Sequence, residues 1–440
     1  TFDFQNFAAF KSIKATNPHL ILMVSVRGWT WSKNFSNIAM TEETRRTFAN
    51  SAVKFLRDYK FDGLDIDWEY PVEGGEESNS RAPEDKENFT LLMKTVREAL
   101  DAAGSEDGKY YLLTIASGQG DNFTVNADFT NSVQYLDFVN IMTYDYSGKS
   151  DSFGHHNAPL FYDKALQTSS APRNHVLGGL LGHLNGGVPT HKLIVGVPYY
   201  GKGWDGCGPL GQYQACNKDG SSFGTWEPAI FDFSDLENNY IDKNGYKRYW
   251  NESAKVPYLY NDQNKVFITY NDKDTMKYTA SIVKSLDIAG VMSWDISGDR
   301  NKTLTTQLIH DLPIDGKINA SALPAPANLA RVSVGESSIQ VKWDAVAGAT
   351  GYEVYVNHAL SGSGIENSYT IHGLNALTNY KIHVLAVDRT GDEINRVSSA
   401  SNLLSVTTLS SSSGGSDGSG GSGGSGSQAP STPQPPKAKD

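Results

Sequence analysis

Three carboxylates alternate with apolar residues in the segment Phe61 to Pro71, which reads Phe-Asp-Gly-Leu-Asp-Ile-Asp-Trp-Glu-Tyr-Pro. Side chains of a β-strand alternate between its two faces, so Asp65, Asp67 and Glu69 share one face. Successive members of this acidic row lie roughly 6.5–7 Å apart, and like charges at that spacing oppose full ionisation where water is scarce. The row predicts carboxylate chemistry, in which a protonated Glu69 donates to a leaving oxygen.

Two other interpretations of the acidic row stay open at this point. The row is either the solvated face of an edge strand or a site for a divalent cation, which prefers oxygen ligands. The first is disfavoured because Leu64, Ile66 and Trp68 make the opposite face apolar, as in a buried strand. We therefore rank catalysis first and metal binding second, and we predict no metal and no cofactor.

Two further pairs of residues carry side chains that bind metals or form cross-links. Cys207 and Cys216 lie in a Gly-rich segment, where a loop-closing disulfide is the favoured interpretation and two free thiols are an alternative of similar weight. His155 and His156 are adjacent in a loop, and neighbouring side chains in an extended loop point apart. We therefore do not expect the histidines to share a metal ion.

The composition indicates a globular chain with more than one domain. Of its 440 residues, 39% are hydrophobic and 11% are aromatic, which is enough for a sizeable core and for aromatic surface. The formal net charge of −11 argues against nucleic acid as a partner, and no run of eighteen apolar residues indicates a membrane span. A neutral ligand fits this charge better.

Six apolar runs alternate with helical segments over the first two thirds of the chain. They are His19–Val26, Phe61–Pro71, Tyr111–Ala116, Phe138–Tyr144, Lys192–Tyr199 and Ile288–Trp294. This alternation predicts a parallel sheet in an α/β fold, either doubly wound or a (β/α)8 TIM barrel. Polar and aromatic residues gather at the carboxyl ends of the runs, namely Ser25, Glu69, Tyr144, Asp145, Tyr200 and Trp294. Such ends converge on one mouth in a barrel, which is therefore favoured.

The helical segments carry their own start signals. A first helix is predicted from Phe4 to Ala15. Thr41 can cap a second helix, with Glu42 and Glu43 in its first turn, and a third begins near Pro83. These helices are the crossovers that a parallel sheet requires.

Two changes of pattern divide the rest of the chain. From about residue 203 to 274 the alternation of apolar runs with helical segments is replaced by short runs rich in Tyr, Trp, Gly and Asn. This change predicts an α+β insertion in a barrel domain of residues 1–315. Alternating runs over residues 323–408 predict a small β-sandwich with Trp343 in its core and Tyr380 as a tyrosine corner. Residues 409–440 are rich in Gly, Ser and Pro, as linkers are.

The acidic row matches a specific signature. Residues 62–69, Asp-Gly-Leu-Asp-Ile-Asp-Trp-Glu, resemble the Asp-x-x-Asp-x-Asp-x-Glu motif of glycoside hydrolase family 18 chitinases. The segments Met142–Asp145, Gly196–Gly201 and Val291–Trp294 resemble other strands of that family. The resemblance runs from the first residues to about Leu312 and includes the insertion, and residues 323–408 resemble a fibronectin type III module.

The resemblance implies a retaining mechanism in which the N-acetyl group of the sugar is the nucleophile, an exception to the two-carboxylate scheme. Glu69 would protonate the glycosidic oxygen, Asp67 would hold the acetamido N–H, and Asp65 would share a proton with Asp67. Tyr144 would donate its hydroxyl to the acetamido group. Without the motif, a place in the core would be the commoner fate of such a tyrosine.

Substrate contacts are expected from several further residues. Asp145 would contact a distorted sugar, and Trp294 would form the floor of the site. We expect the remaining contacts from Trp29, Tyr200, Trp204, Met142 and Ser25. The tryptophans that we expect to pack the insertion or the exterior of the barrel are Trp31, Trp226 and Trp250.

The chain departs from the family pattern in three places. Relatives usually carry Ser-x-Gly-Gly where this chain has Ser25-Val-Arg27-Gly28, so an arginine adds bulk and charge near the acidic row, and strain if that position needs a positive φ. Lys202 stands where many relatives have arginine, which keeps the charge and loses the bidentate fork. Family barrels also have two strands before the one that ends at Ser25, so we expect the first two strands to be missing and the sequence to be truncated at its N-terminus.

The expected function is that of a secreted, extracellular chitinase. The expected partner is chitin or chitooligosaccharides, with no nucleic acid, no membrane and a monomeric state. An endo-β-N-acetylglucosaminidase would share the acidic row, but the insertion and the fibronectin-like module favour polymeric chitin. A chitin-binding lectin usually lacks the terminal glutamate, which is present here as Glu69. The fibronectin-like part is expected to act as a spacer.

Overall fold

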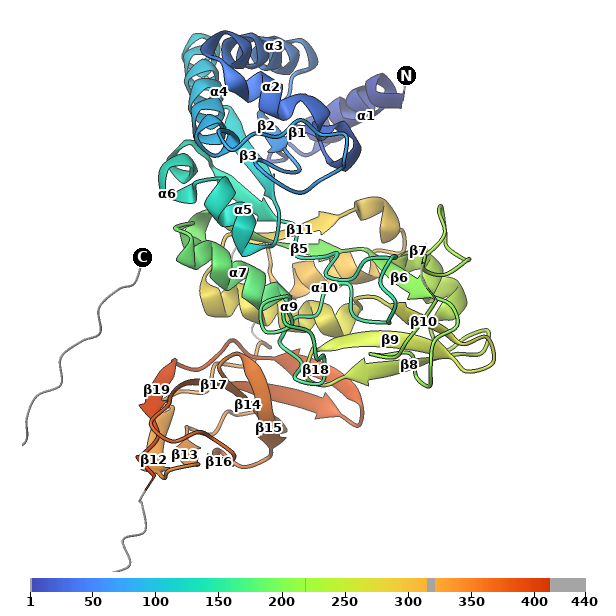
Figure 1. The fold of residues 1–440 in the computed structure, drawn as a ribbon, viewed down its shortest axis with the longest axis vertical. Helices are drawn as coiled ribbons and strands as arrows, with labels where there is room; N and C mark the ends of the chain where they lie inside the picture. Colours follow the sequence, from blue (N-terminus) through green and yellow to red (C-terminus); the bar gives the residue numbers. More distant parts are fainter. Residues whose placement is uncertain (1, 218, 315–320, 412–440) are drawn as a thin grey trace, which may run out of the picture.

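The computed structural model describes residues 2–217, 219–314 and 321–411. They form a curved parallel sheet with its helices, an inserted antiparallel sheet and a second, all-β domain (Figure 1). Most of the predicted linker, from residue 412 on, lies outside the described residues. Among the described helices, none has both the length and the apolar character needed to cross a bilayer.

Six parallel strands form the first sheet in the order β1-β2-β3-β4-β5-β11. They are β1 (Met23–Arg27), β2 (Gly63–Asp67), β3 (Leu112–Ser117), β4 (Phe138–Ile141), β5 (Leu193–Pro198) and β11 (Gly290–Trp294). Each overlaps one of the six predicted runs, so the prediction of a barrel-like α/β fold with six strands is confirmed. Within the described residues β1 and β11 are the two edges, and the sheet is an open half-barrel.

The helices that alternate with these strands along the chain pack over the half-barrel (Figure 1). They are α1 (Phe2–Thr16), α2 (Phe35–Met40), α3 (Glu42–Tyr59), α4 (Asp85–Asp107), α5 (Asp121–Asn126), α6 (Phe129–Ser132), α7 (Val176–Asn185), α9 (Lys273–Leu286) and α10 (Thr303–Asp311). Thr41 caps α3 as predicted, because its Oγ1 accepts a hydrogen bond from the Thr44 N–H at 3.2 Å. The Thr44 side chain also bonds the Thr41 N–H, which completes a capping box.

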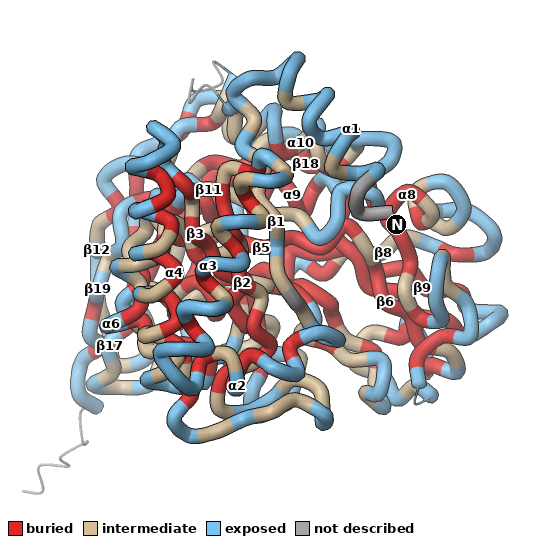
Figure 2. The backbone as a smooth tube through the Cα atoms, turned by 90° about the horizontal axis from the view of Figure 1, so that it is seen from above, coloured by how far each residue is buried: buried red, intermediate tan, exposed pale blue. Residues whose placement is uncertain are grey.

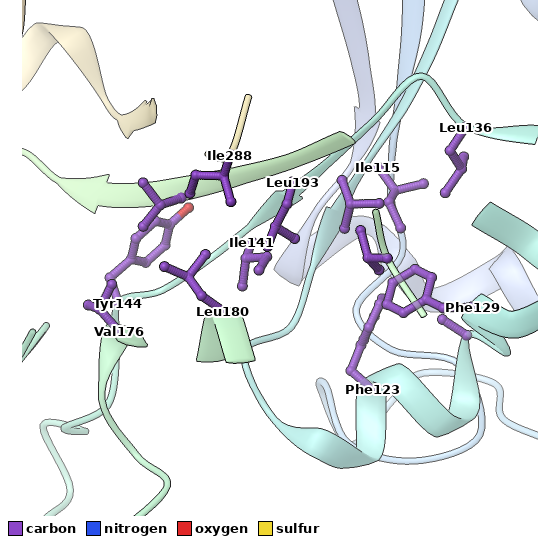
Figure 3. Packing of buried hydrophobic residues seen from close by; sticks show 14 of the residues in the cluster. Ile115, Phe123, Phe129, Leu136, Ile141, Tyr144, Val176, Leu180, Leu193 and Ile288 are labelled. Carbon is purple, nitrogen blue, oxygen red and sulfur yellow. The ribbon is translucent and has the colours of Figure 1, made fainter. Parts of the chain in front are cut away.

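An apolar core fills the space between the half-barrel and its helices, and Figure 2 shows it as a buried interior under an exposed surface. Side chains from β3, β4 and β5 meet those of α5, α6 and α7 there (Figure 3). Leu64 and Ile66 on the apolar face of β2, and Trp68 just after the strand, are each 2% exposed or less. The acidic row therefore belongs to a strand that is buried on one face, and the edge-strand interpretation of that row is wrong.

The insertion is an antiparallel sheet in the order β7-β6-β10-β9-β8. Its elements are β6 (Tyr200–Trp204), β7 (Ile230–Asp232), the short helix α8 (Phe233–Asp235), β8 (Tyr246–Asn251), β9 (Val256–Asn261) and β10 (Val266–Thr269). A disulfide joins Cys207 to Cys216 in the loop after β6, which confirms the favoured interpretation of these cysteines. The insertion follows β5 directly and returns to the half-barrel through α9.

The second domain consists of two antiparallel sheets. One contains β12 (Ala330–Val334), β13 (Ile339–Lys342) and β16 (Ser368–Ile371), and the other contains β14 (Gly351–Val356), β15 (Ala359–Gly364), β17 (Asn379–Thr390), β18 (Glu393–Val397) and β19 (Leu404–Thr407). Trp343 is buried in its core, as predicted. The Tyr380 hydroxyl accepts a hydrogen bond from the Asn375 N–H at 2.8 Å, which confirms the tyrosine corner.

Candidate active site

The acidic row begins with Asp65, which neighbouring strands hold in place. Ser25 on β1 and Thr114 on β3 lie opposite Asp65 in the sheet register. The Asp65 carboxylate accepts hydrogen bonds from Ser25 Oγ at 2.7 Å, Thr114 Oγ1 at 2.6 Å and Asn140 Nδ2 at 3.4 Å. Removal from water raises the pKa of Asp65, and these hydrogen bonds act against the rise.

Asp67 has the opposite environment. Its Oδ1 atom is buried and has no hydrogen-bond partner among the described residues. Burial, and then the negative charges of Glu69 and Asp65, raise the pKa of Asp67 to about 8. An unpaired buried oxygen costs free energy, so Asp67 is well suited to receive a donor from a ligand.

Glu69 lies just beyond β2, which is shorter than predicted and ends two residues before it. The Glu69 N–H donates to Ser32 Oγ, and its carbonyl accepts from Asn79 Nδ2, both at 2.9 Å. The residue is only 7% exposed. Burial raises the pKa of Glu69, a hydrogen bond from the Tyr70 hydroxyl opposes the rise, and the negative charge of Asp145 adds to it. The backbone of Glu69 is thus held on both sides, and burial favours the protonated form of its carboxyl.

The loop after β4 adds a tyrosine and an aspartate to the site. The Tyr144 hydroxyl has the Met292 sulfur as its recorded partner, at 4.0 Å, and a thioether is a weak acceptor. Asp145 Oδ1 accepts a hydrogen bond from the Tyr200 hydroxyl at 2.5 Å and lies 2.6 Å from Lys202 Nζ. Since Tyr200 and Lys202 lie on β6, the insertion holds the Asp145 side chain in place.

The carboxyl ends of the strands open into a cleft of about 1310 Å³. Of the predicted site residues, Glu69, Tyr144, Asp145, Met142, Tyr200, Trp29 and Trp294 line this cleft. Asp65, Asp67 and Ser25 lie behind Glu69 on β1 and β2. Trp29 and Trp294 are 49% and 55% exposed where they line the cleft.

Trp204 does not belong to the cleft, and its predicted contact with the substrate is wrong. The residue is completely buried and packs against Phe267, with ring centroids 5.9 Å apart. Trp204 and Phe267 pair across β6 and β10 on the inner face of the insertion sheet. Trp204 therefore stabilises the insertion and presents no face to a sugar.

Trp226, which we expected to pack the insertion or the exterior of the barrel, is a cleft residue. It lines the cleft and is 81% exposed. Its Nε1 donates to Asp232 Oδ2 at 2.8 Å, and Arg300 Nη1 donates to the same oxygen at 2.6 Å. The stretch just before Trp226 is rich in Gly and Ser, and Phe223 is its one large apolar residue. This composition was a signal that the tryptophan is exposed.

The positive φ expected near the acidic row falls on Gly28 and not on Arg27. Arg27 ends the extended strand β1 opposite Asp67, whereas Gly28 has a φ of +111°. The side chain of Arg27 lies outside what the structure describes. The glycine that the backbone requires is therefore present in this chain.

The two adjacent histidines turn to different partners. His155 Nε2 lies 2.7 Å from Asp151 Oδ2, and His156 Nε2 lies 3.2 Å from Gln212 Oε1. Across residues 2–217, 219–314 and 321–411, no group of three His, Cys, Asp or Glu side chains is arranged to hold a metal ion. The functional groups that line the cleft include carboxyl, phenol and indole side chains.

Comparison with protein-family models identifies both parts of the chain. The model described as Glycosyl hydrolases family 18 matches residues 1–299, which is more than half of the sequence. The chain belongs to glycoside hydrolase family 18. The model described as Fibronectin type III domain matches residues 324–401, within the second domain of this family 18 chain.

Several family 18 relatives match over most of the chain. Chitinase A1 of Niallia circulans is 48% identical over 414 residues, which cover 92% of this chain and 58% of the relative. The solved structure of Chitinase ChiA74 from Bacillus thuringiensis is 40% identical with a TM-score of 0.67, and covers 92% of this chain and 68% of that one. A family 18 N-acetylglucosaminidase from Paenibacillus barengoltzii is 36% identical with a TM-score of 0.64, over 71% and 88% respectively. The chain thus spans little more than half the length of Chitinase A1.

Proposed function

We propose that this family 18 chain is a chitinase, which hydrolyses the β-1,4 bonds of N-acetylglucosamine polymers with retention of configuration. The observation that carries the proposal is Glu69, a buried carboxyl with a raised pKa at a cleft with exposed tryptophans. A general acid must keep its proton near neutral pH, and burial favours that form. The names of Chitinase A1 and Chitinase ChiA74 support chitin as the substrate class.

Glu69 acts in both steps of the proposed reaction. In the first step it gives its proton to the glycosidic oxygen as the bond from that oxygen to the anomeric carbon breaks. The carbonyl oxygen of the substrate's own acetamido group attacks the anomeric carbon from the opposite face and forms an oxazolinium ring. In the second step the Glu69 carboxylate takes a proton from water, which opens the ring and restores the original configuration.

Asp67, Asp65 and Tyr144 act on the acetamido group. The unpartnered Oδ1 of Asp67 accepts the acetamido N–H and stabilises the positive charge that develops on the ring. Asp67 holds a proton in the free protein. When the substrate binds, Asp67 shares this proton with Asp65 and so becomes the anion that the acetamido group requires. The Tyr144 hydroxyl, whose hydrogen-bond partner among the described residues is the weak acceptor Met292, donates to the acetamido oxygen.

The remaining cleft residues bind the sugar chain. The carboxylate of Asp145, fixed by Tyr200 and Lys202, accepts a sugar hydroxyl. The exposed faces of Trp294, Trp29 and Trp226 support the proposal that they stack on sugar rings, and Met142 fills the floor beside them. Monomeric action outside the cell, with no cofactor, stays a prediction from the sequence.

Two alternative functions share this scaffold. An enzyme that removes N-acetylglucosamine or acts on glycans would use the same acidic row, and the Paenibacillus barengoltzii relative is named an N-acetylglucosaminidase. The inserted sheet that extends the cleft favours a polymeric substrate. A non-catalytic lectin is disfavoured because Glu69 is present and lines the cleft.

The proposal is tested with Glu69→Gln, which keeps the shape of the side chain and removes its proton. Glu98→Gln on the exposed face of α4 is the matched control. We expect Glu69→Gln to bind chitin oligosaccharides and to cleave them about 10²–10⁴-fold more slowly, because general acid catalysis contributes a factor of that size. Cleavage that survives Glu69→Gln, or that a chelator abolishes in the unmodified protein, would refute it.

A further inference from the structure

The second domain shares a hydrophobic core with the half-barrel. Tyr355, Leu385, Val387, Ile394 and Val397 belong to the same continuous cluster of buried residues as the core of the half-barrel. Across the contact, the rings of Tyr355 and Phe161 lie 4.8 Å apart. In Figure 1 the sheet that carries β14, β17 and β18 lies directly against α9. A spacer that moved independently would leave these apolar side chains in water.

A buried carboxylate lies at the centre of this contact. Glu353 on β14 is 1% exposed. Its Oε1 accepts hydrogen bonds from Lys255 Nζ at 2.7 Å, Tyr278 Oη at 2.8 Å and Arg389 Nη2 at 2.9 Å, and its Oε2 accepts from Tyr355 Oη at 2.9 Å. Lys255 comes from the insertion and Tyr278 from α9, so one carboxylate ties three parts of the fold together.

The charges around Glu353 balance one another. Lys255 is completely buried and its ammonium also lies 3.1 Å from Glu252 Oε2. Arg389 Nη1 reaches Glu252 Oε1 at 2.7 Å. Burial by itself would raise the pKa of Glu252, but the charges of Lys255 and Arg389 lower it to about 2. Two cations and two anions therefore meet at the contact, and removal of one would leave an uncompensated buried charge.

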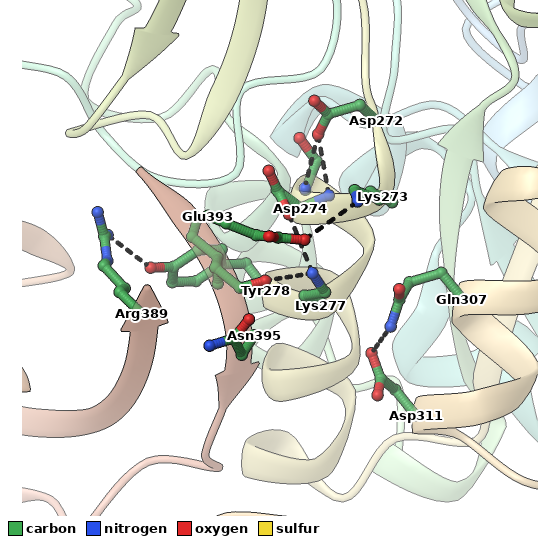
Figure 4. A network of polar contacts seen from close by, with 12 residues as sticks. Asp272, Lys273, Asp274, Lys277, Tyr278, Gln307, Asp311, Arg389, Glu393 and Asn395 are labelled. Carbon is green, nitrogen blue, oxygen red and sulfur yellow. Dashed lines mark hydrogen bonds and ion pairs between the residues drawn. The ribbon is translucent and has the colours of Figure 1, made fainter. Parts of the chain in front are cut away.

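A second set of polar contacts continues along α9. Figure 4 shows Lys273 directed at Glu393, with 3.5 Å between the charged atoms, and Lys277 held between α9 and the β17–β18 hairpin. Lys277 Nζ donates to the carbonyl of Ile394 and lies 3.0 Å from Asp274. Further along, Ser281 Oγ donates to the carbonyl of Ser398 at 2.5 Å. The contact thus extends over most of the length of the helix.

We propose that the second domain is a fixed brace of the cleft, locked by Glu353, and not a mobile spacer. The segments that it grips are the β8–β9 turn of the insertion and α9, which leads into β11 and so to Trp294 at its carboxyl end. The brace therefore holds the insertion and β11, with Trp294 at its carboxyl end, in one arrangement. This proposal goes beyond the hydrolytic function and does not depend on it.

The test is calorimetric unfolding of the full chain, with Glu353→Gln and the matched control Glu366→Gln, whose side chain is exposed on the same domain. We expect the unmodified chain and the control to unfold in one transition. Glu353→Gln should unfold at a temperature lower by about 5 °C or more, in two separate transitions. Two transitions in the unmodified chain, or identical behaviour of the two variants, would overturn the proposal.

A double-mutant cycle distinguishes loss of the contact between Lys255 and Glu353 from a general destabilisation of the fold. Lys255→Gln and Glu353→Gln are each expected to lower the melting temperature, and the double variant is expected to lose clearly less than the sum of the two. Hydrogen exchange at the α9 amides should also rise in Glu353→Gln and stay unchanged in Glu366→Gln, because α9 lies in the other domain. Additive losses, or unchanged exchange at α9, would show that the carboxylate does not link the domains.

Discussion

A Cβ atom on Gly28 would stand 3.1 Å from Oδ2 of Asp67. The glycine that follows β1 therefore lies against the middle carboxyl of the acidic row, with a backbone φ of +111° that other residues rarely adopt. The arginine before it ends an extended strand. Gly28 is thus the position in this loop where a side chain would disturb the carboxyl.

Gly28→Ala is expected to lower the rate of hydrolysis and also to destabilise the fold. The new methyl group would push the Asp67 carboxyl by a few tenths of an ångström, and small displacements of catalytic groups reduce rates by up to about 10²-fold. The positive φ would destabilise the fold by about 1–3 kcal/mol. Initial rates and melting temperatures test this against Gly364→Ala, where a Cβ meets nothing within 4 Å. Equal activity in the two variants would contradict the role of Gly28.

The stability of the Asp67→Asn variant relative to the unmodified protein is expected to increase as the pH rises from about 4 to 8. The folded-state pKa of Asp67, about 8, lies above the ordinary aspartate value of 3.8. The folded state therefore holds a proton that the unfolded state has lost, so stability that is present below pH 3.8 is lost as the pH rises through 8. Asparagine does not titrate and escapes this loss. Melting temperatures of both proteins across this range test it, and a constant difference would contradict the raised pKa.

Trp226→Ala and Trp204→Ala are expected to have opposite effects. Trp226 is exposed at the cleft, so its loss should weaken turnover of long chitin oligosaccharides by about tenfold and leave the melting temperature unchanged. Trp204 is completely buried, and its truncation should cost about 3–5 kcal/mol of stability. Rates on oligosaccharides of increasing length, together with thermal unfolding, distinguish the two. A stability loss in Trp226→Ala would contradict the assignment.

Local patterns were enough to predict the strands and the acidic row. Alternation in β2 placed Asp65 and Asp67 on one face and Ile66 on the other, because the period of a strand follows from backbone geometry. The motif around Glu69 then indicated the chemistry. The extent of β2 was predicted too long, since the strand ends at Asp67, where its partner β1 also ends.

Contacts between distant segments were beyond prediction from the sequence. Whether Trp204 or Trp226 faces the cleft depends on partners such as Phe267, which another strand supplies. Likewise, Lys255 and Glu353 are 98 residues apart, and neither residue stands out among the other charges of the chain. For that reason we predicted from the sequence that the second domain is a spacer, although its sheet lies against α9.

The central claim is that Glu69 supplies the proton while the substrate supplies the nucleophile. The most direct test is to incubate the protein with a chitin oligosaccharide and to record, by NMR at the earliest time point, which anomer forms at the new reducing end. The account predicts the β-anomer, and its disappearance in Glu69→Gln. Initial formation of the α-anomer would contradict the retaining mechanism.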